Sequence, residues 1–420
     1  MTASKTSPSS IDALRLPEVR AFIGAIGSFT FASRALAVVI GFQIYQITHS
    51  ALSLGWLGLI EAVPALSLVL FGGYIADHYD RRKILLFTRS ASFLCALGLA
   101  ALSFYAAKGS LIGLYSVIFL VGIARGFADP ANAAFESQVV PRHLTINGSS
   151  WISSMWISAS IIGPGAIGFV FEAWGAIGAY LLIAAFFFLS VVATITIAPK
   201  PLPLIERKEP LFKSIALGWT FVFSHQPLWG AMALDLFAVL FGGAIALLPI
   251  YATDILHVGA RGLGLLNAAT SIGALITTLI ATRHPPIGRA GRNLFISVLG
   301  FGVSILIFAF SKNFWLSMSA LFLSGAFDGI SMVIRRSMTR LLTPNELRGR
   351  VSSVGFLFIC SSNELGAFES GMVAAWIGTV PCVAAGGIIT FLVVAITALL
   401  TPELRRLRFD TTTMAQTKTS

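Results

Sequence analysis

The ionisable residues that interrupt long apolar stretches of the sequence include Arg34, Arg125, Asp129, Asp235, Asp328 and Glu364. A charged side chain is costly in such a stretch and usually faces a partner or a water-filled cavity, so each residue is a candidate functional group. They could bind a charged ligand or carry protons, because burial can raise the pKa of a carboxyl group until it titrates near neutral pH. For proton coupling we rank Asp328 first, then Glu364, then Asp129.

Arg125 and Asp129 also have a purely structural interpretation. With Asn132 and Glu136 they follow a spacing of 4, 3 and 4, which places all of them on one narrow stripe of a helix. An arginine and an aspartate at i and i+4 can simply neutralise each other. Arg34 has no such neighbour in its own segment, so it needs an acid from another segment, an anionic ligand, or each in turn.

The composition shows which elements must position these residues. Of the 420 residues 56% are hydrophobic and 11% are charged, and the mean hydropathy is +0.84, which excludes a water-soluble globular protein. A membrane span needs roughly 20 mostly apolar residues. We therefore predict an all-α polytopic membrane protein with twelve transmembrane helices, at residues 20–47, 51–76, 84–107, 111–138, 149–172, 176–198, 228–252, 262–282, 294–311, 314–338, 351–376 and 381–400.

The sequence contains no catalytic or metal-binding pattern. The histidines lack metal-ligand spacing, and neither a phosphate-binding loop nor a nucleophile constellation is present. We therefore expect neither an enzyme nor an ATP-driven pump, and we expect no cofactor and no metal.

Basic residues predict the orientation of the chain. If the N-terminus is inside, the outer loops contain only Lys108, Arg261 and Lys312, whereas most of the 29 Lys and Arg residues, Arg335 and Arg336 included, fall on the inner side. This asymmetry predicts that both termini are cytoplasmic. The net charge of +11 therefore reflects topology and not the binding of nucleic acid.

Parts of the sequence repeat at a constant offset of 203 residues. The matches are Gly122 with Gly325, Gly126 with Gly329, Pro141 with Pro344, Leu144 with Leu347, and Ser149-Ser150 with Ser352-Ser353. They predict two pseudo-symmetric six-helix bundles, a plan typical of secondary transporters. The predicted parts are a cytoplasmic N-terminal tail (1–19), an N-terminal bundle (20–198), a linker with an interfacial helix (199–227), a C-terminal bundle (228–400) and a cytoplasmic C-terminal tail (401–420).

A charged loop follows the second predicted span in the stretch GGYIADHYDRRK, Gly72 to Lys83. It resembles the signature loop of the major facilitator superfamily at Gly73, Asp77, Arg81, Arg82 and Lys83, although His78 and Asp80 depart from that signature.

This resemblance implies that Asp77 faces the start of the eleventh span near Val351, where a helix N-terminus favours negative charge. It also implies that Arg81 pairs with Glu136, and that the two contacts form a cytoplasmic gate. Arg82 and Lys83 fit a role as signals of topology, whereas Asp77 and Arg81, at helical spacing, fit the gate better.

A second motif lies in the fifth predicted span. The stretch IIGPGAIG resembles a signature of proton-driven antiporters through Gly163, Pro164 and Gly168, while Ala159 and Ile167 replace expected glycines. An ordinary helix kink explains these residues equally well. Longer stretches, such as LRGRVSSVGFLFICSSNELGAFESG, are similar to the bacterial enterobactin exporters and related drug-proton antiporters.

These resemblances imply a proton-coupled secondary transporter of the bacterial inner membrane. It would export a small organic molecule by alternating access, with a catecholate siderophore as candidate cargo; the alternatives are a multidrug-proton antiporter and an importer of the same fold. The implied partners are the cargo, protons and the lipid bilayer, and the implied state is a monomer. In the superfamily, spans 1, 4, 7 and 10 line a central cavity, which implies cavity positions for Arg34, Arg125, Asp129, Asp235 and Asp328.

Overall fold

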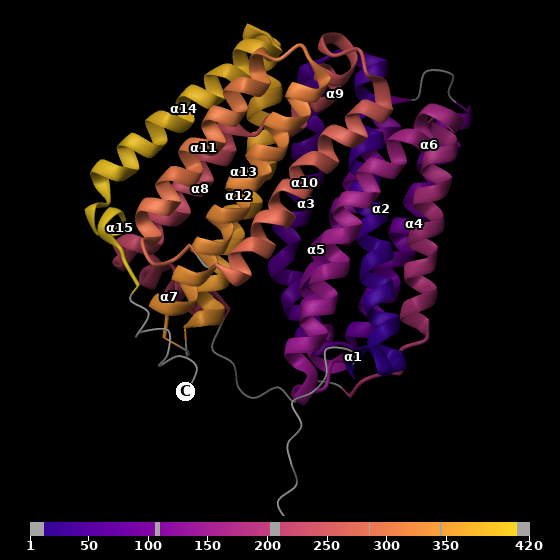
Figure 1. The fold of residues 1–420 in the computed structure, drawn as a ribbon. Helices are drawn as coiled ribbons and strands as arrows, with labels where there is room; N and C mark the ends of the chain where they lie inside the picture. The colour runs from indigo at the N-terminus through magenta and orange to yellow at the C-terminus, as the bar shows by residue number, and fades with distance from the viewer. Residues whose placement is uncertain (1–11, 106–109, 202–210, 285, 345–346, 410–420) are drawn as a thin grey trace, which may run out of the picture. The chain divides into compact units, whose positions relative to one another are not determined.

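The computed structural model describes residues 12–105, 110–201, 211–284, 286–344 and 347–409, and every regular element within these ranges is a helix (Figure 1). The chain forms two compact units: unit 1 comprises Met1–Gln43 and Ile60–Glu206, and unit 2 comprises Ile44–Leu59 and Arg207–Ser420. The predicted tail residues 1–11 and 410–420 and the linker residues 202–210 lie outside the described ranges.

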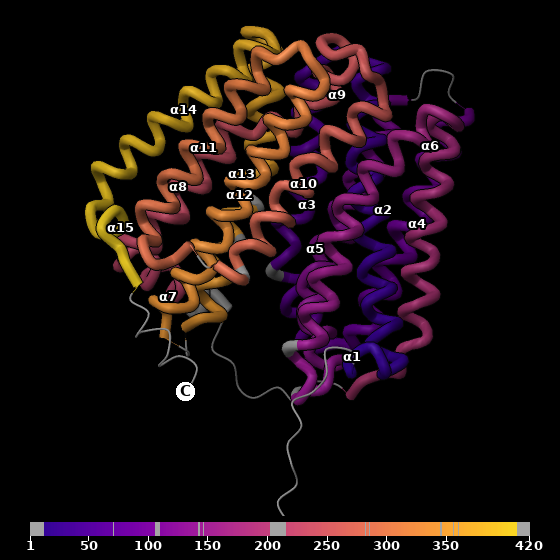
Figure 2. Tube along the Cα trace, in the orientation of Figure 1, coloured from indigo at the N-terminus to yellow at the C-terminus, as the bar shows by residue number. Residues whose placement is uncertain are grey.

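The elements before the linker are α1 (Asp12–Arg15), α2 (Pro17–Thr48), α3 (Ala51–His78), α4 (Arg81–Tyr105), α5 (Leu111–Val139), η1 (Arg142–Leu144) and α6 (Thr145–Ile195). Those after it are α7 (Leu211–Ser224), α8 (Gln226–Gly242), η2 (Ala244–Leu247), α9 (Leu248–Ile250), η3 (Tyr251–Ile255), α10 (Gly259–Arg283), α11 (Ala290–Phe310), α12 (Phe314–Leu342), α13 (Arg348–Ile377), α14 (Thr379–Leu400) and α15 (Pro402–Arg406). In unit 2, α11 packs between α12 and α14 (Figure 2).

The described helices are long and apolar enough for twelve membrane spans. Eleven helical segments are long and apolar enough to span a bilayer. One of them lies in α6, where Gly175 has φ 66° and ψ −169°, a conformation that only glycine adopts easily, so two helices meet there. Because a helix rises about 1.5 Å per residue, the 51 residues of α6 are long enough for two spans. The predicted twelve-helix fold is confirmed.

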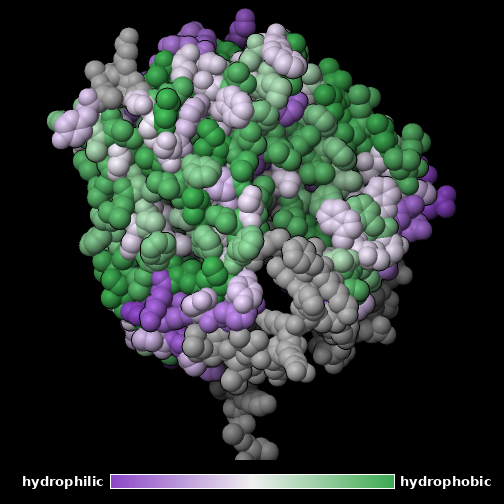
Figure 3. Space-filling model, turned by 180° about the vertical axis from the view of Figure 1, so that it is seen from behind, coloured by the Kyte–Doolittle hydropathy of each residue, from purple (hydrophilic) through white to green (hydrophobic). Residues whose placement is uncertain are grey.

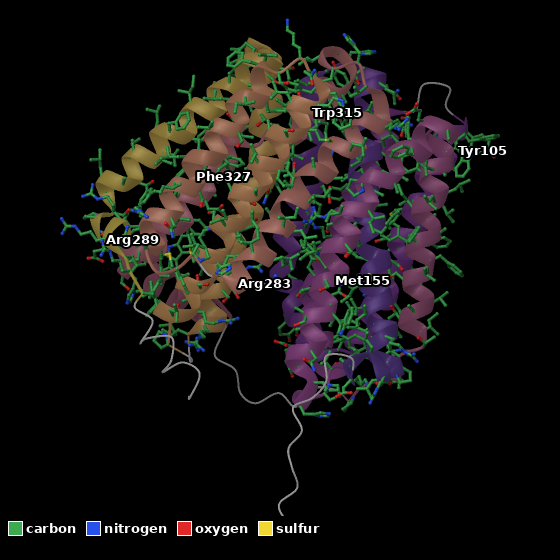
Figure 4. The ribbon with its side chains drawn as sticks, viewed as in Figure 1. Tyr105, Met155, Arg283, Arg289, Trp315 and Phe327 are labelled. Carbon is green, nitrogen blue, oxygen red and sulfur yellow. The ribbon has the colours of Figure 1, made fainter. Side chains whose placement is uncertain are left out.

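The outer surface suits a bilayer. Apolar residues cover most of the face shown in Figure 3, and hydrophilic residues gather mainly toward its edges. Tyr105 ends α4 and Trp315 lies at the start of α12; both side chains are exposed (Figure 4). Exposed aromatic residues at helix ends are typical of the membrane interface.

The repeated glycines hold equivalent helix pairs together. A Cβ atom at Gly122 on α5 would lie 2.4 Å from the carbonyl oxygen of Glu61 on α3. The corresponding Cβ at Gly325 on α12 would lie 1.9 Å from the carbonyl oxygen of Thr270 on α10. Only glycine therefore permits these close backbone approaches, and the same position of the repeat provides it in each unit.

The seventh span is less regular than predicted. The sequence predicts a continuous helix over 228–252, but α8 ends at Gly242 and is followed by the short elements η2, α9 and η3. The adjacent Gly242 and Gly243, together with Pro249, disfavour a regular helix. The hydroxyl of Ser370 donates a hydrogen bond of 3.4 Å to the carbonyl oxygen of Gly243, which helps to satisfy the broken backbone.

The second part of the predicted linker forms α7. This helix packs on α13, since a Cβ at Gly218 would lie 2.8 Å from the carbonyl oxygen of Arg350. Val222 is fully buried in a cluster with Leu228 and Val351. One face of α7 therefore packs against the rest of unit 2.

Candidate functional site: charged clusters within the spans

In unit 1, Arg125 on α5 lies between two carboxylates. Its Nη1 atom is 3.0 Å from Oε1 of Glu61 on α3, and its Nε atom is 3.7 Å from Oδ2 of Asp129. The close approach at Gly122, one turn before Arg125, brings α3 within reach. All three side chains are half-exposed, at 40% for Arg125, 27% for Glu61 and 44% for Asp129. The group is therefore accessible from the surface of unit 1.

Arg34 on α2 joins this group. Its guanidinium carbon lies 5.6 Å from the ring centroid of Trp156 on α6, within the range of a cation-π interaction. Arg34 also interacts electrostatically with Asp129. The partners that Arg34 needs thus come from other segments of unit 1, as its isolated position in the sequence requires.

In unit 2, Arg335 on α12 also faces two carboxylates. It forms a close ion pair with Asp235 on α8, and its Nη2 atom lies 3.7 Å from Oδ1 of Asp328. Arg335 and Asp235 are 14% and 8% exposed, whereas Asp328 is 46% exposed. The structure thus combines a buried ion pair with one accessible carboxylate.

Two members of these clusters, Glu61 and Arg335, are absent from the predicted site residues. The sequence places Arg335 among the basic residues of the inner side, but the structure places it within α12, paired with acids. The sequence could have predicted that Arg335 lies near Asp328, because the two residues are seven positions apart, which is two helical turns on the same face. No comparable spacing links Glu61 to Arg125, since they lie on different helices.

Arg89 is a further guanidinium within the spans and is 1% exposed. It donates a 2.9 Å hydrogen bond to Oδ1 of Asn132 and another hydrogen bond to the hydroxyl of Thr194. Its guanidinium carbon also lies 5.8 Å from the ring centroid of Phe29. No carboxylate of the described ranges lies within ion-pair distance of Arg89, so neutral groups hold this charge.

The residues of the predicted gate form local contacts. Arg81 lies 3.8 Å from Asp77 and donates a 3.1 Å hydrogen bond to the carbonyl oxygen of Ala134 on α5. Glu136 instead accepts a 2.6 Å hydrogen bond from the hydroxyl of Ser149. Among the described residues, Arg81 is therefore paired with Asp77, four residues before it, and not with Glu136.

The remaining gate residues have separate roles. Arg82 donates a 2.8 Å hydrogen bond to the carbonyl oxygen of Ile195, a position near the end of α6 where backbone acceptors lack helical partners. Lys83 is exposed. A Cβ at Gly73 would meet open space, whereas one at Gly72 would lie 2.3 Å from the carbonyl oxygen of Gly126. The glycine that permits close packing is therefore Gly72.

The residues of the fifth-span motif lie on α6 of unit 1, and Glu364 lies on α13 of unit 2. A Cβ at Gly163 on α6 would lie 2.8 Å from the carbonyl oxygen of Phe31 on α2, and Pro164 and Gly168 lie within the same helix. Glu364 is half-buried on α13. Across the described ranges, no group of three or more His, Cys, Asp or Glu side chains could hold a metal ion.

The known proteins that this chain resembles are transporters. Residues 3–417 match the model of a family described as transmembrane secretion effector. The enterobactin exporter EntS of Shigella boydii serotype 18 (strain CDC 3083-94 / BS512) is 25% identical over 375 residues, which cover 89% of each chain. The enterobactin exporter EntS of Escherichia coli O139:H28 (strain E24377A / ETEC) has the same identity and coverage.

Solved transporter structures have a similar fold. A POT family transporter in complex with a thioalcohol conjugated peptide superposes with a TM-score of 0.73 at 12% identity, covering 92% of this chain and 96% of the other. An inward-facing bacterial homologue of the human lysosomal transporter Spinster superposes with a TM-score of 0.71 at 14% identity, covering 94% and 98%. At these identities the structural matches establish the fold alone.

Proposed function

Because the chain belongs to the transmembrane secretion effector family of the major facilitator superfamily, we propose that it is a proton-coupled exporter of a small organic molecule. It is a membrane transporter and not an enzyme. We place it in the bacterial inner membrane with both termini in the cytoplasm, working as a monomer by alternating access.

The observation that carries this proposal is the accessible carboxylate of Asp328 beside the buried Asp235 and Arg335 pair. A carboxylate within a spanning helix is retained only at a cost, which favours a role in the transport path. If Asp328 takes up a proton, Arg335 keeps Asp235 as its partner, so the helices stay together while the charge changes. In unit 1, Asp129 could take up a proton in the same way, because Arg125 would still have Glu61 as its partner. Glu364 remains the further candidate for carrying protons.

The proposed cargo is a catecholate siderophore. The relatives that match along 89% of the chain are enterobactin exporters. Unit 1 also presents a guanidinium within cation-π range of an indole, at Arg34 and Trp156. A cation beside an aromatic face can bind a catechol through both its ring and its oxygen atoms.

A lipophilic cation is the second candidate cargo. Unit 2 sets two carboxylates, Asp235 and Asp328, against the single arginine Arg335, which leaves one negative charge when both acids are ionised. An excess of negative charge favours a cationic ligand.

The cargo can be tested with purified protein in liposomes under an imposed pH gradient. We expect an apo-catecholate siderophore to start proton flux, with protein-free liposomes as the control. Flux started by ethidium and not by the siderophore would favour multidrug export, and no flux with either would contradict both cargo proposals.

The direction is tested separately with membrane vesicles. For an exporter, cargo accumulates in inverted vesicles when protons are supplied from the vesicle interior. Accumulation in right-side-out vesicles and not in inverted ones would show an importer.

A further inference from the structure

An open cavity of about 580 Å³ lies in unit 2 at one end of α11, α14 and α15. Five arginines surround its mouth: Arg289, Arg292, Arg405, Arg406 and Arg408. All of them are exposed, and no carboxylate of the described residues lies within 4.0 Å of any of these guanidinium groups. The cavity therefore concentrates positive charge that the described part of the protein does not neutralise.

The floor of the cavity is apolar. It is formed by Phe295, Ile296 and Leu299 of α11 and by Val394 and Ala398 of α14. On α11, Ile296 follows Arg292 by four residues and Leu299 follows it by seven, so one face changes from charged to apolar over about 10 Å of helix. Ile296 and Leu299 are 51% and 36% exposed. The cavity thus continues from a charged mouth onto an apolar membrane-facing groove.

The arginines of α15 are held in place. The backbone N–H of Gly291 donates a 3.3 Å hydrogen bond to the carbonyl oxygen of Leu407. A Cβ at Gly291 would lie 1.7 Å from the carbonyl oxygen of Leu404, whose side chain is fully buried. The chain after α14 therefore packs against the start of α11, and the arginines on both sides face one cavity (Arg289 is labelled in Figure 4).

We propose that this cavity binds an anionic phospholipid, with its phosphate among the arginines and an acyl chain along α11 and α14. Guanidinium groups bind phosphate through paired, charge-assisted hydrogen bonds. Basic pockets between membrane helices suit lipid headgroups, and a soluble anion would not use the apolar groove. Because five arginines can hold more than one phosphate, cardiolipin binds more tightly than phosphatidylglycerol, and phosphatidylcholine binds weakly. The site is independent of the transported cargo.

The test uses the full-length protein in detergent, with bound lipid counted by native mass spectrometry during a titration. We expect saturable binding of cardiolipin, and about tenfold or greater weakening in an Arg405→Gln/Arg408→Gln variant, because each basic residue near a lipid surface contributes to binding. The matched control is Arg283→Gln/Arg340→Gln, which removes the same charge from exposed arginines of unit 2 outside the cavity. The control should bind cardiolipin like the unchanged protein.

A second variant and a competition with phosphate provide further tests. If the Arg405→Gln/Arg408→Gln variant fails to fold, as judged by its thermal unfolding, Arg289→Gln/Arg292→Gln removes charge from the opposite wall and should weaken binding as strongly. Inorganic phosphate at matched concentration should not displace the lipid. Equal binding by the cavity and control variants, or displacement by free phosphate, would overturn the proposal.

Discussion

The two units place opposite charges at the same position of the repeat. Arg125 on α5 corresponds to Asp328 on α12 at the offset of 203, and Asn132 corresponds in the same way to Arg335. Asn132 accepts a hydrogen bond from Arg89, whereas Arg335 pairs with Asp235. At these two positions of the repeat, both units therefore have a polar residue, but its charge differs between the units.

The clusters also differ in burial. In unit 1 all three members are half-exposed, whereas in unit 2 Arg335 and Asp235 are buried and only Asp328 is accessible. Removing one partner of a buried ion pair strongly destabilises the protein, because an unpaired charge stays buried. A half-exposed pair is screened by its surroundings and contributes little to stability. We therefore expect the pair Asp235 and Arg335 to be structural, and Asp328 and the unit 1 cluster to act in transport.

The largest expected effect is on the stability of unit 2. Asp235→Asn leaves Arg335 buried without its close partner and should lower the free energy of unfolding by about 3–5 kcal/mol, measured by denaturant unfolding in detergent. The matched control is Asp235→Leu/Arg335→Leu, which removes both charges and should recover most of the loss. A loss below about 1 kcal/mol for Asp235→Asn would show that the pair is not structural.

A smaller effect is expected at the repeated glycines. Gly122→Ala and Gly325→Ala should each lower the free energy of unfolding by about 1–3 kcal/mol, because the added methyl group meets a backbone carbonyl that cannot easily move. Gly325→Ala should have the larger effect, since its Cβ would lie 1.9 Å from that oxygen compared with 2.4 Å at Gly122. Gly73→Ala is the control, because its Cβ would meet open space. Equal stability of all three variants would contradict the close packing.

The smallest effect on stability is expected in unit 1. Glu61→Gln should change the free energy of unfolding by less than about 1 kcal/mol, because the pair with Arg125 is half-exposed. Cargo efflux from proteoliposomes should nevertheless decrease, since Arg125 then keeps only Asp129. A stability loss as large as that of Asp235→Asn would remove the contrast between the two clusters.

The fold could be predicted from the sequence because a bilayer imposes a simple requirement. Each span needs roughly 20 apolar residues, so the twelve segments stand out, and Gly175 lies between the predicted segments 149–172 and 176–198. The break after Gly242 was harder to predict, because apolar residues continue through it and hide the change in backbone.

The contacts of the site were harder to predict from the sequence. The candidates Arg125, Asp129, Asp235 and Asp328 lie in the clusters, because a charge inside a span is conspicuous. Their partners depend on which helices pack together, which hydropathy does not encode, so the sequence does not pair Glu61 with Arg125. The sequence places Arg335 on the inner side because it lies near the end of its span. The contact of Asp77 with the helix start near Val351 stays a prediction.

The central claim is that Asp328 couples transport to protons while the pair beside it maintains the structure. The most direct measurement compares Asp328→Asn with the unchanged protein in proteoliposomes, recording both cargo accumulation under a pH gradient and exchange of cargo at equal pH. We predict that the variant unfolds at the same temperature, loses gradient-driven accumulation and retains exchange. A correctly folded Asp328→Asn protein that still accumulates cargo under the gradient would contradict the account.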